Sequence, residues 1–429
     1  MEWARRDGQI ALITHARWLF PGKAREKARR DLLESVQITG ILNGTAVRDT
    51  SVWPGSRAPF AIVFARNTRP HGPDAAFQFV SPTVTEQSQK TQRRLRIDWN
   101  DAELVGGQNA LANPWLLKLR FRGTSFDHGV LTKLIGGRST LESHLDSMGA
   151  SLKRGYEYEI EGDASPSKLL DLLDLVSEQK RAKESPTQPS QGYRVRADVL
   201  SLFAEPMVHR EPTRAECTAP LLLVKKSPPA NPFLSRTSIS EQDVTFSQSW
   251  FAASFAVVDD GLAQARWLQL LLQSGTFLYF ALLTDGWFGV ERDHYILETL
   301  KAFPVVPYEQ LTDRQRKTAL KLSEALWTKG WSKKLQRQID ALVLDLYEFD
   351  DVERDSIGDT LATALPYAEQ RRNAVLPPQY VPTTRTSNCF IRGTTVASLS
   401  RPVSLSSSRT SGSMRGRHAL HEISISKES

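Results

Sequence analysis

The sequence has only two cysteines among its 429 residues, Cys217 and Cys389. Two thiols this far apart exclude a disulfide framework and a cysteine-rich metal site, and they favour a reducing, cytoplasmic compartment. Long hydrophobic runs are missing as well, because no stretch approaches the about 18 apolar residues that a membrane-spanning helix needs. The first residues also lack the apolar core of a secretory signal. We therefore expect a cytoplasmic protein.

Patterns that carry catalytic or metal chemistry are missing too. The histidines show neither an HxxxH pair nor a His-Cys spacing, so no zinc site is indicated. The carboxylates of Asp345, Asp350 and Asp351 flank a predicted helix end, where they are typical of caps and solubilising charge rather than of a nuclease site. No repeat of solenoid type is visible. The sequence therefore assigns no catalytic acid, base or metal ligand.

Positive charge is present in excess. The formal net charge is +7 and the isoelectric point is near 9.3, which favours DNA or RNA as a partner over an acidic small molecule. Apolar residues make up 40% of the chain and charged residues 24%, so it is long and apolar enough for two to four domains with real cores.

Residues 1–70 are predicted to form part of an α/β domain. Strands are expected at Ile10–Thr14, Ile38–Leu42 and Pro59–Ala65, the last a continuous apolar run typical of a buried strand. A cationic helix is expected at Gly22–Ser35. Its apolar face is expected to carry Ala24, Ala28 and Leu32. Three strands and one helix cannot close a doubly wound, Rossmann-like sheet, so we expect this sheet to be incomplete.

The middle of the chain is predicted to be a polar linker at residues 71–95 and a mixed α+β domain at residues 96–310. Its elements are expected to be strands at Trp115–Arg122, Tyr193–Leu200 and Ala219–Val224, and helices at Pro166–Lys180 and Leu262–Leu272.

The last part is predicted to be a helical spacer at residues 311–385 and a disordered tail at residues 386–429. A capping box at Thr312–Gln315 opens a helix that runs to about Lys329. A second helix is expected around Leu335–Leu346, and a third, containing Ile357, is expected to stop at Pro366. The tail is rich in Ser, Arg and Gly and has few large apolar residues.

Cations on the predicted strands are the candidate DNA contacts. In Trp115–Arg122, alternate residues are basic, and side chains two apart on a strand are about 6.6 Å apart, close to the spacing of successive phosphates. Tyr193–Leu200 repeats this pattern, and two lysines close the strand at Ala219–Val224. The candidates are Lys118, Arg120, Arg122, Arg194, Arg196, Lys225, Lys226 and Arg236. The same pattern is also typical of the solvated face of an ordinary half-buried sheet, and the basic helix at Gly22–Ser35 is a weaker candidate.

Several stretches, taken in order, resemble the type I and type IIG restriction-modification methyltransferases that act on the adenine amino group. GQIALITHARWLF, ILNGTAV and APFAIVFARN are similar to strands at the end of the methyltransferase sheet, and they lie at Gly8–Phe20, Ile41–Val47 and Ala58–Asn67. Pieces similar to the target-recognition region and its closing helices lie at Pro114–Asp127, Ala219–Pro229, Gly286–Tyr295, Phe303–Arg316 and Ile339–Tyr347. The resemblance covers roughly residues 1–378.

The resemblance implies S-adenosylmethionine as methyl donor, double-stranded DNA as substrate and flipping of the target adenine. Two family motifs are nevertheless missing from the sequence: the Gly-rich cofactor turn and the Asn/Asp-Pro-Pro-aromatic loop that holds the adenine. Gly106-Gly107, Asn113-Pro114-Trp115 and Asn231-Pro232-Phe233 match them only faintly, and each is expected to be ordinary loop sequence.

The sequence therefore predicts the DNA-recognizing, carboxyl-terminal part of an adenine-specific methyltransferase, which needs a second chain for the cofactor site and is inactive alone. One alternative is a non-enzymatic specificity module that works with separate methyltransferase and nuclease subunits. Another is an enzyme active by itself through a rearranged loop at Asn113-Pro114-Trp115. An RNA-binding protein is a more distant alternative, because no aromatic RNA-binding signature is present.

Overall fold

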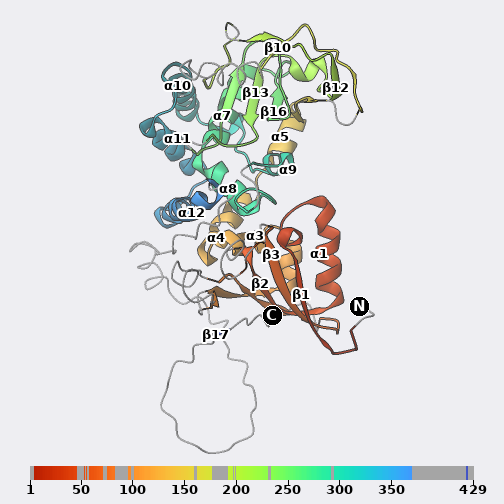
Figure 1. The fold of residues 1–429 in the computed structure, drawn as a ribbon. Coiled ribbons are helices and arrows are strands. Elements are labelled where there is room, and N and C mark those ends of the chain that lie inside the picture. Colours follow the sequence, from red (N-terminus) through yellow and green to blue (C-terminus); the bar gives the residue numbers. More distant parts are fainter. Residues whose placement is uncertain are drawn as a thin grey trace, which may run out of the picture.

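The computed structural model of the chain is a mixed α/β structure of two packed units (Figure 1). The structure describes residues 4–45, 53, 55, 58–70, 75–82, 95–97, 101–158, 162–175, 192–196, 198, 200–229, 233–290, 294–369 and 422–423. We call the part from β1 to α3 the sheet unit and the part from α4 to α12 the large unit.

The sheet unit is built on a five-stranded sheet of order β1-β3-β2-β4-β6. Its strands are β1 (Gln9–His15), β2 (Gln37–Asn43), β3 (Phe60–Arg66), β4 (Ala76–Val80) and β6 (Ala102–Gly106). β3 runs antiparallel between β1 and β2, β4 is parallel to β2, and β6 is antiparallel to β4. β3 is thus an inner strand, as its continuous apolar sequence predicts.

One face of this sheet is covered by helices. These are η1 (Ala16–Leu19), α1 (Lys23–Ser35), α2 (Gly107–Ala112) and α3 (Leu116–Arg122). Their apolar residues join the sheet in one core that contains Phe20, Leu33, Val63 and Phe79. The face of α1 differs from the expected one, because Ala28 is exposed while Leu33 and even Arg29 are buried.

One expectation for this unit was wrong and another is not confirmed. The sheet has five strands rather than three, because β4 lies inside the segment expected to be a linker and β6 comes from the expected recognition domain. The sheet also mixes parallel and antiparallel pairs, so the Rossmann-like arrangement stays a prediction.

The opposite face of the sheet and its β1 edge expose apolar side chains. Phe64 lies in a cross-strand row with Ala11, Gly40, Gln78 and Leu104. On this face Ile13, Phe64 and Leu104 are 54%, 42% and 65% exposed. Leu12, on the other face of the edge strand β1, is 42% exposed. β1 therefore carries apolar, solvent-exposed residues on both of its faces.

The large unit is organised around a four-stranded antiparallel sheet of order β14-β13-β16-β7. Its strands are β7 (Leu152–Arg154), β13 (Leu221–Lys225), β14 (Thr237–Ser240) and β16 (Trp250–Ser254). Alternate residues of β13 enter two different cores: Leu222 and Val224 face the helices, while Leu221 and Leu223 face a smaller β-rich cluster. This sheet is therefore buried on both faces, and β13 confirms the strand expected at Ala219–Val224.

Short strands make up the rest of the β structure. They are β5 (Leu95–Arg96), β8 (Glu157–Tyr158), β9 (Ser165–Pro166), β10 (Leu173–Asp174), β11 (Ser201–Leu202), β12 (Met207–Arg210), β15 (Val244–Thr245) and β17 (Glu422–Ile423), with the 3₁₀ turns η6 (Arg214–Cys217) and η7 (Tyr308–Gln310). They form the sheets β11-β10-β15, β8-β12-β9 and β17-β5.

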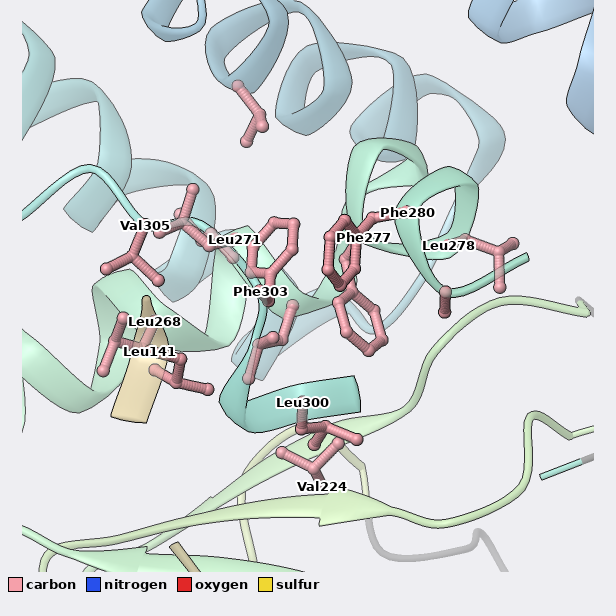
Figure 2. Packing of buried hydrophobic residues seen from close by; sticks show 14 of the residues in the cluster. Leu141, Val224, Leu268, Leu271, Phe277, Leu278, Phe280, Leu300, Phe303 and Val305 are labelled. Carbon is pink, nitrogen blue, oxygen red and sulfur yellow. The ribbon is translucent and has the colours of Figure 1, made fainter. Parts of the chain in front are cut away.

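Helices form the other half of the large unit. They are α4 (Ser125–Ile135), α5 (Leu141–Ser147), α7 (Gly261–Gln273), α8 (Gly275–Thr284), α9 (Leu297–Lys301), α10 (Asp313–Lys329), α11 (Lys333–Leu346) and α12 (Asp351–Glu369). Figure 2 shows their core, in which the ring of Phe303 lies 5.2 Å from Phe277 and 5.4 Å from Phe280, centroid to centroid. α10–α12 pack into this same core, so the expected helical spacer is continuous with the rest of the unit.

Several predicted helices are confirmed. α7 matches Leu262–Leu272, α11 matches the second helix of the spacer, and α10 begins with the predicted capping box at Thr312 and Gln315. α12 continues past Pro366 to Glu369, so the expected stop was wrong.

Three other elements were predicted wrongly or only in part. Trp115–Arg122, expected to be a strand, is the N-terminal cap and helix of α3. No helix forms in the described part of Pro166–Lys180, which contains β10 instead. The described residues of Tyr193–Leu200 form only a bridge between Arg194 and Ile239. The tail at 386–429 lies outside the described residues except for β17, and its disorder stays a prediction.

Within the described ranges, no single helix is long and apolar enough to span a membrane. α7 and α8 together have the length and apolar composition of a membrane span, but they are bent by 61° relative to each other, and most of their residues lie in the core of the large unit.

Candidate nucleic-acid interface

A cavity of about 390 Å³ lies where the sheet unit meets the large unit. The sheet unit contributes Gly22 and Arg25, at the start of α1. The other lining residues, all from the large unit, are Arg154, Lys226, Phe251, Trp287, His294, Ile296, Leu297 and Glu298. We call this the inter-unit cleft. Three of its residues are cationic and one is acidic, so its wall is predominantly positive.

The backbone of Lys226 is fixed on both sides. Its N–H donates to the carbonyl of Ser249 at 2.8 Å, and its carbonyl accepts from the N–H of Tyr295 at 2.9 Å. Burial lowers the pKa of the Lys226 amine below the ordinary lysine value, and the charges of Arg154 and Arg210 lower it further while Glu157 opposes them. Lys226 thus lies in a cluster of like charges, which an anionic ligand would relieve.

Arg154 and Arg25 approach the cleft from opposite units. Arg154 ends β7 and lies 3.6 Å from Glu298, with the side chains of both about half exposed. Such an exposed pair contributes little and leaves the guanidinium open to a competing anion. The Arg25 guanidinium lies within 3.4 Å of the carbonyls of Arg17 and Pro21, so it is held at the start of α1.

A loop that follows α8 joins the walls of the cleft; we call its first part, Asp285–Val290, the junction loop. The buried carboxylate of Asp285 accepts four hydrogen bonds of 2.6–2.9 Å. One oxygen accepts from the N–H groups of Trp287 and Phe288, and the other from the N–H of Ile296 and the hydroxyl of Thr299. Four hydrogen bonds saturate the carboxylate, so its role is to fix the loop.

Trp287, on this loop, presents an aromatic surface between the units. The Arg17 guanidinium lies 5.2 Å from the centre of its ring, and the His294 ring lies 5.4 Å away. The indole N–H is buried and has no acceptor among the described residues. An aromatic ring beside several cations is a combination that can contact both bases and phosphates.

Three candidates from the predicted strand at Trp115–Arg122 lie elsewhere, because that segment is a helix. Lys118 is buried and donates to the carbonyl of Phe288 at 2.7 Å, so its proposed DNA contact is withdrawn. Arg120 is 14% exposed and forms an ion pair with Glu103. The side chain of Arg122 lies outside the described residues. The phosphate-spacing argument for this segment was therefore wrong.

The remaining candidates are scattered over the large unit. Arg194 pairs with Glu241 at 2.6 Å, and Arg196 pairs with Asp198 at 2.6 Å, in both cases on the surface. Lys225 lies 5.9 Å from the ring of Trp250. Arg236 is half-buried beside β14. Of the candidates on predicted strands whose side chains the structure describes, only Lys226 lines the cleft. Arg25, from the basic helix that was the weaker candidate, lines it too, and DNA contacts by the other candidates except Lys118 stay predictions.

Sequence reasoning missed Arg154, Trp287 and His294. Arg154 belongs to a strand of three residues, too short for a visible alternation, and its neighbours in the cleft are more than 70 residues away in the chain. A usable signal was the Gly286–Tyr295 stretch, which carries both Trp287 and His294 and which the resemblance to the methyltransferases includes.

Two faint cofactor and catalytic motifs have ordinary structural roles. Gly107 donates its N–H to the carbonyl of Ala75 at 2.8 Å, and a Cβ on Gly107 would lie 3.0 Å from that oxygen. The glycine thus accommodates the chain itself rather than a ligand. Asn113 caps α2, and its amide contacts Asn109. Asn231 and Pro232 of the third motif lie outside the described residues.

The described part of the chain contains no group of three or more His, Cys, Asp or Glu side chains placed to hold a metal ion. The buried Cys217 has its thiol pKa raised to about 12 by burial, so it is not a reactive nucleophile near neutral pH.

No family model matches the chain, and no curated protein is similar to it in sequence. Solved structures to which it is similar include restriction-modification enzymes. One is the type IIG restriction endonuclease BpuSI, with 13% identity and a TM-score of 0.31 over 80% of this chain and 48% of that one. Another is the type IIL restriction-modification enzyme MmeI, solved in complex with DNA, with 11% identity and a TM-score of 0.42 over 85% and 50%.

A methyltransferase subunit of a type I restriction-modification system from Streptococcus thermophilus is similar over 27% of each chain, with 18% identity and a TM-score of 0.20. The chain spans about half the length of BpuSI and of MmeI.

Proposed function

We propose that this chain is the DNA-recognition part of an adenine-specific DNA methyltransferase of a restriction-modification system. The observation that carries the proposal is the inter-unit cleft, in which Arg25, Arg154 and Lys226 converge beside Trp287. Clustered cations next to an aromatic ring suit a nucleic-acid strand better than they suit an acidic metabolite. We propose DNA as the nucleic acid, and adenine as the target base, because the sequence resembles these methyltransferases.

In this proposal the cleft holds the DNA backbone. Arg154 and Lys226 from the large unit and Arg25 from the sheet unit contact phosphates from two sides, and Trp287 packs against the sugar or base between them. Phosphate contacts set affinity and register, whereas base contacts elsewhere on the large unit set sequence choice.

Methyl transfer itself needs groups from outside the described residues. S-adenosylmethionine would supply the methyl group, but the Gly106–Gly107 turn is closed by Ala75 and does not fit the donor. We therefore assign no catalytic step to the described residues. A second polypeptide would bring the cofactor turn and the Asn-Pro-Pro-aromatic loop.

The β1 edge of the sheet is the proposed docking site for that polypeptide. The strand QIALITH has no acidic residue, lysine, arginine or proline, which are the usual protections of an edge strand. Leu12 and Ile13 are exposed on its opposite faces, as in a strand made to be covered from both sides. The occupant is therefore a chain that adds a strand to β1 and apolar cover to both faces, as the front of a methyltransferase sheet would.

A non-enzymatic specificity module that acts with separate subunits remains the second candidate, favoured by the closed Gly106–Gly107 turn. The two candidates differ in what the second chain adds. If mixing this chain with a chain that carries the Asn-Pro-Pro-aromatic loop restores methylation of duplex DNA at a specific site, and the β1 edge is buried in the complex, the first is supported. Methylation that proceeds without contact at β1 supports the second.

Replacing Lys226 with alanine is expected to weaken duplex DNA binding about tenfold and to make the salt dependence shallower by about one unit of d log K/d log [salt], because one phosphate contact is lost. Fluorescence anisotropy at several salt concentrations measures both. The matched control is Lys321→Ala, which removes an exposed lysine from α10, far from the cleft along the chain, and should leave the slope unchanged. Equal slopes for wild type, Lys226→Ala and Lys321→Ala would refute the cleft as the DNA site.

Replacing Ile13 with lysine is expected to abolish the complex with the second polypeptide, because it places a charge in the centre of the proposed strand junction. Size-exclusion chromatography with light scattering, on this chain mixed with a chain carrying the Asn-Pro-Pro-aromatic loop, measures the complex. Leu202→Lys is the control, since Leu202 is 60% exposed on β11 in the other unit. A self-dimer that Ile13→Lys dissociates would show that the edge pairs with a second copy instead.

A further inference from the structure

A buried lysine lies between the two units. Lys118 is on α3, which belongs to both cores: Leu117 and Phe121 pack in the core of the sheet unit, and Leu119 packs in the core of the large unit. The Lys118 ammonium donates to the carbonyl of Phe288 at 2.7 Å, and it lies 5.2 Å from the centre of the Phe20 ring. One cation thus contacts a residue of each core.

The junction loop makes further contacts around this lysine. Val290 is buried in the core of the sheet unit, while Phe288 is buried in that of the large unit. Gly286 leaves no room for a side chain, because a Cβ there would lie 2.7 Å from the carbonyl oxygen of Pro21 and 2.8 Å from the Arg25 guanidinium. The loop is therefore held on the sheet unit by Pro21, Lys118 and Val290, and on the large unit by Asp285.

The walls of the cleft depend on the same loop. Trp287 is part of it, Arg25 packs against Gly286, and the N–H of Tyr295, a few residues on, holds the carbonyl of Lys226. A shift of the junction loop relative to α3 would therefore move the two cationic walls relative to each other.

We propose that Lys118 is a positioning residue that sets the separation of the cationic walls of the inter-unit cleft through the carbonyl of Phe288. A buried ammonium is costly unless it is paired, so its hydrogen bond to one particular carbonyl selects one arrangement of the two units over others that an apolar contact would tolerate. This inference rests on the proposed function only in treating the cleft as a DNA-binding site. The role of Lys118 in the arrangement of the two units does not depend on it.

The test is Lys118→Met, which keeps the length of the side chain and removes the donor. Two readouts are needed. The first is the distance distribution between spin labels on Cys residues introduced at Arg30 of α1 and Lys321 of α10, both exposed, with Cys389 replaced by Ser. The second is DNA affinity with its salt slope. We expect a broadened or shifted distance distribution and about tenfold weaker binding with an unchanged slope, because position and not a phosphate contact is lost.

A distance distribution identical to that of the unsubstituted protein would overturn the inference. A shallower salt slope would overturn it as well, since it would mean that Lys118 contacts DNA directly. If the unsubstituted chain binds no DNA, the proposed function fails, while the distance measurement still decides the positioning role. If Lys118→Met does not fold, Gly286→Ala disturbs the same junction from the loop side and should broaden the same distribution; an unchanged distribution in that folded variant would count against the inference.

Discussion

Replacing Asp285 with alanine is expected to lower the free energy of unfolding by about 4 kcal/mol, because three backbone N–H groups and one hydroxyl lose their acceptor in a buried site. The N–H groups of Trp287 and Phe288 belong to the junction loop, and that of Ile296 lies a few residues beyond it, so most of the loss falls on this loop. The same variant should also bind DNA more weakly, because Trp287 and the carbonyl of Phe288 lose their fixed positions. Chemical denaturation followed by fluorescence measures the first effect.

Two variants calibrate this result. Asp285→Asn keeps one acceptor oxygen, that of the amide, and should cost about half as much, because two of the four donors keep an acceptor. Asp259→Ala removes an exposed aspartate in a turn and should change stability by less than about 0.5 kcal/mol. An Asp285→Ala variant as stable as Asp259→Ala would show that the junction loop is not held as described.

Replacing Gly155 with alanine is the second large effect, with an expected loss of about 3 kcal/mol or more. A Cβ at Gly155 would overlap the carbonyl oxygens of Phe246 and Ser247, which are backbone atoms and cannot turn away. Relief requires the end of β7 to move away from the 246–247 turn, and Arg154, the preceding residue, would move with it. We therefore expect the folded Gly155→Ala variant to bind DNA more weakly than the unsubstituted protein. Binding is measured well below the unfolding midpoint of the variant, so that it stays folded.

Gly129→Ala is the matched control for this substitution. Gly129 is an exposed residue inside α4, and a Cβ there would meet nothing within 4 Å. Alanine should stabilise the helix by about 0.5–1 kcal/mol. If Gly155→Ala were as stable as Gly129→Ala, the close packing of β7 and the 246–247 turn would be wrong.

Local patterns predicted much of the secondary structure. The apolar run at Pro59–Ala65 became the inner strand β3, and the Thr312–Gln315 capping box opens α10 through both of its hydrogen bonds. Both predictions succeeded because the residues that determine the element lie within one short segment. For β3 these are its continuous apolar side chains, and for α10 they are the residues of the cap.

The α3 segment failed for the opposite reason. α3 is wedged between two cores, so Leu117 and Lys118, although adjacent, are both buried. A helix buried on several sides has no single apolar stripe, and its alternating sequence imitates a strand. The two cores that bury it come from distant parts of the chain, which no local pattern contains.

Of the cationic cleft residues, the sequence predicted Lys226 directly and Arg25 only as part of the weaker basic helix, and it missed Arg154. Lys226 follows a recognisable apolar strand, so strand reasoning found it. Arg154 becomes its neighbour only when β7 and β13 pair on either side of β16 in the large unit, and Arg25 only when the sheet unit packs against the large unit. The charge of +7 indicated an anionic partner, but not where its surface lies.

The most direct test of the central claim, that DNA lies in the inter-unit cleft, is site-specific photocrosslinking. A photoreactive amino acid is placed at His294 in the cleft and, as a control, at Val257, which is 77% exposed on the large unit and does not line the cleft. Irradiation with labelled duplex DNA should give a covalent adduct at position 294 and little at 257, with the adduct lost on competition by unlabelled duplex. An adduct at 257 in the absence of one at 294, for a protein that binds DNA, would contradict the account.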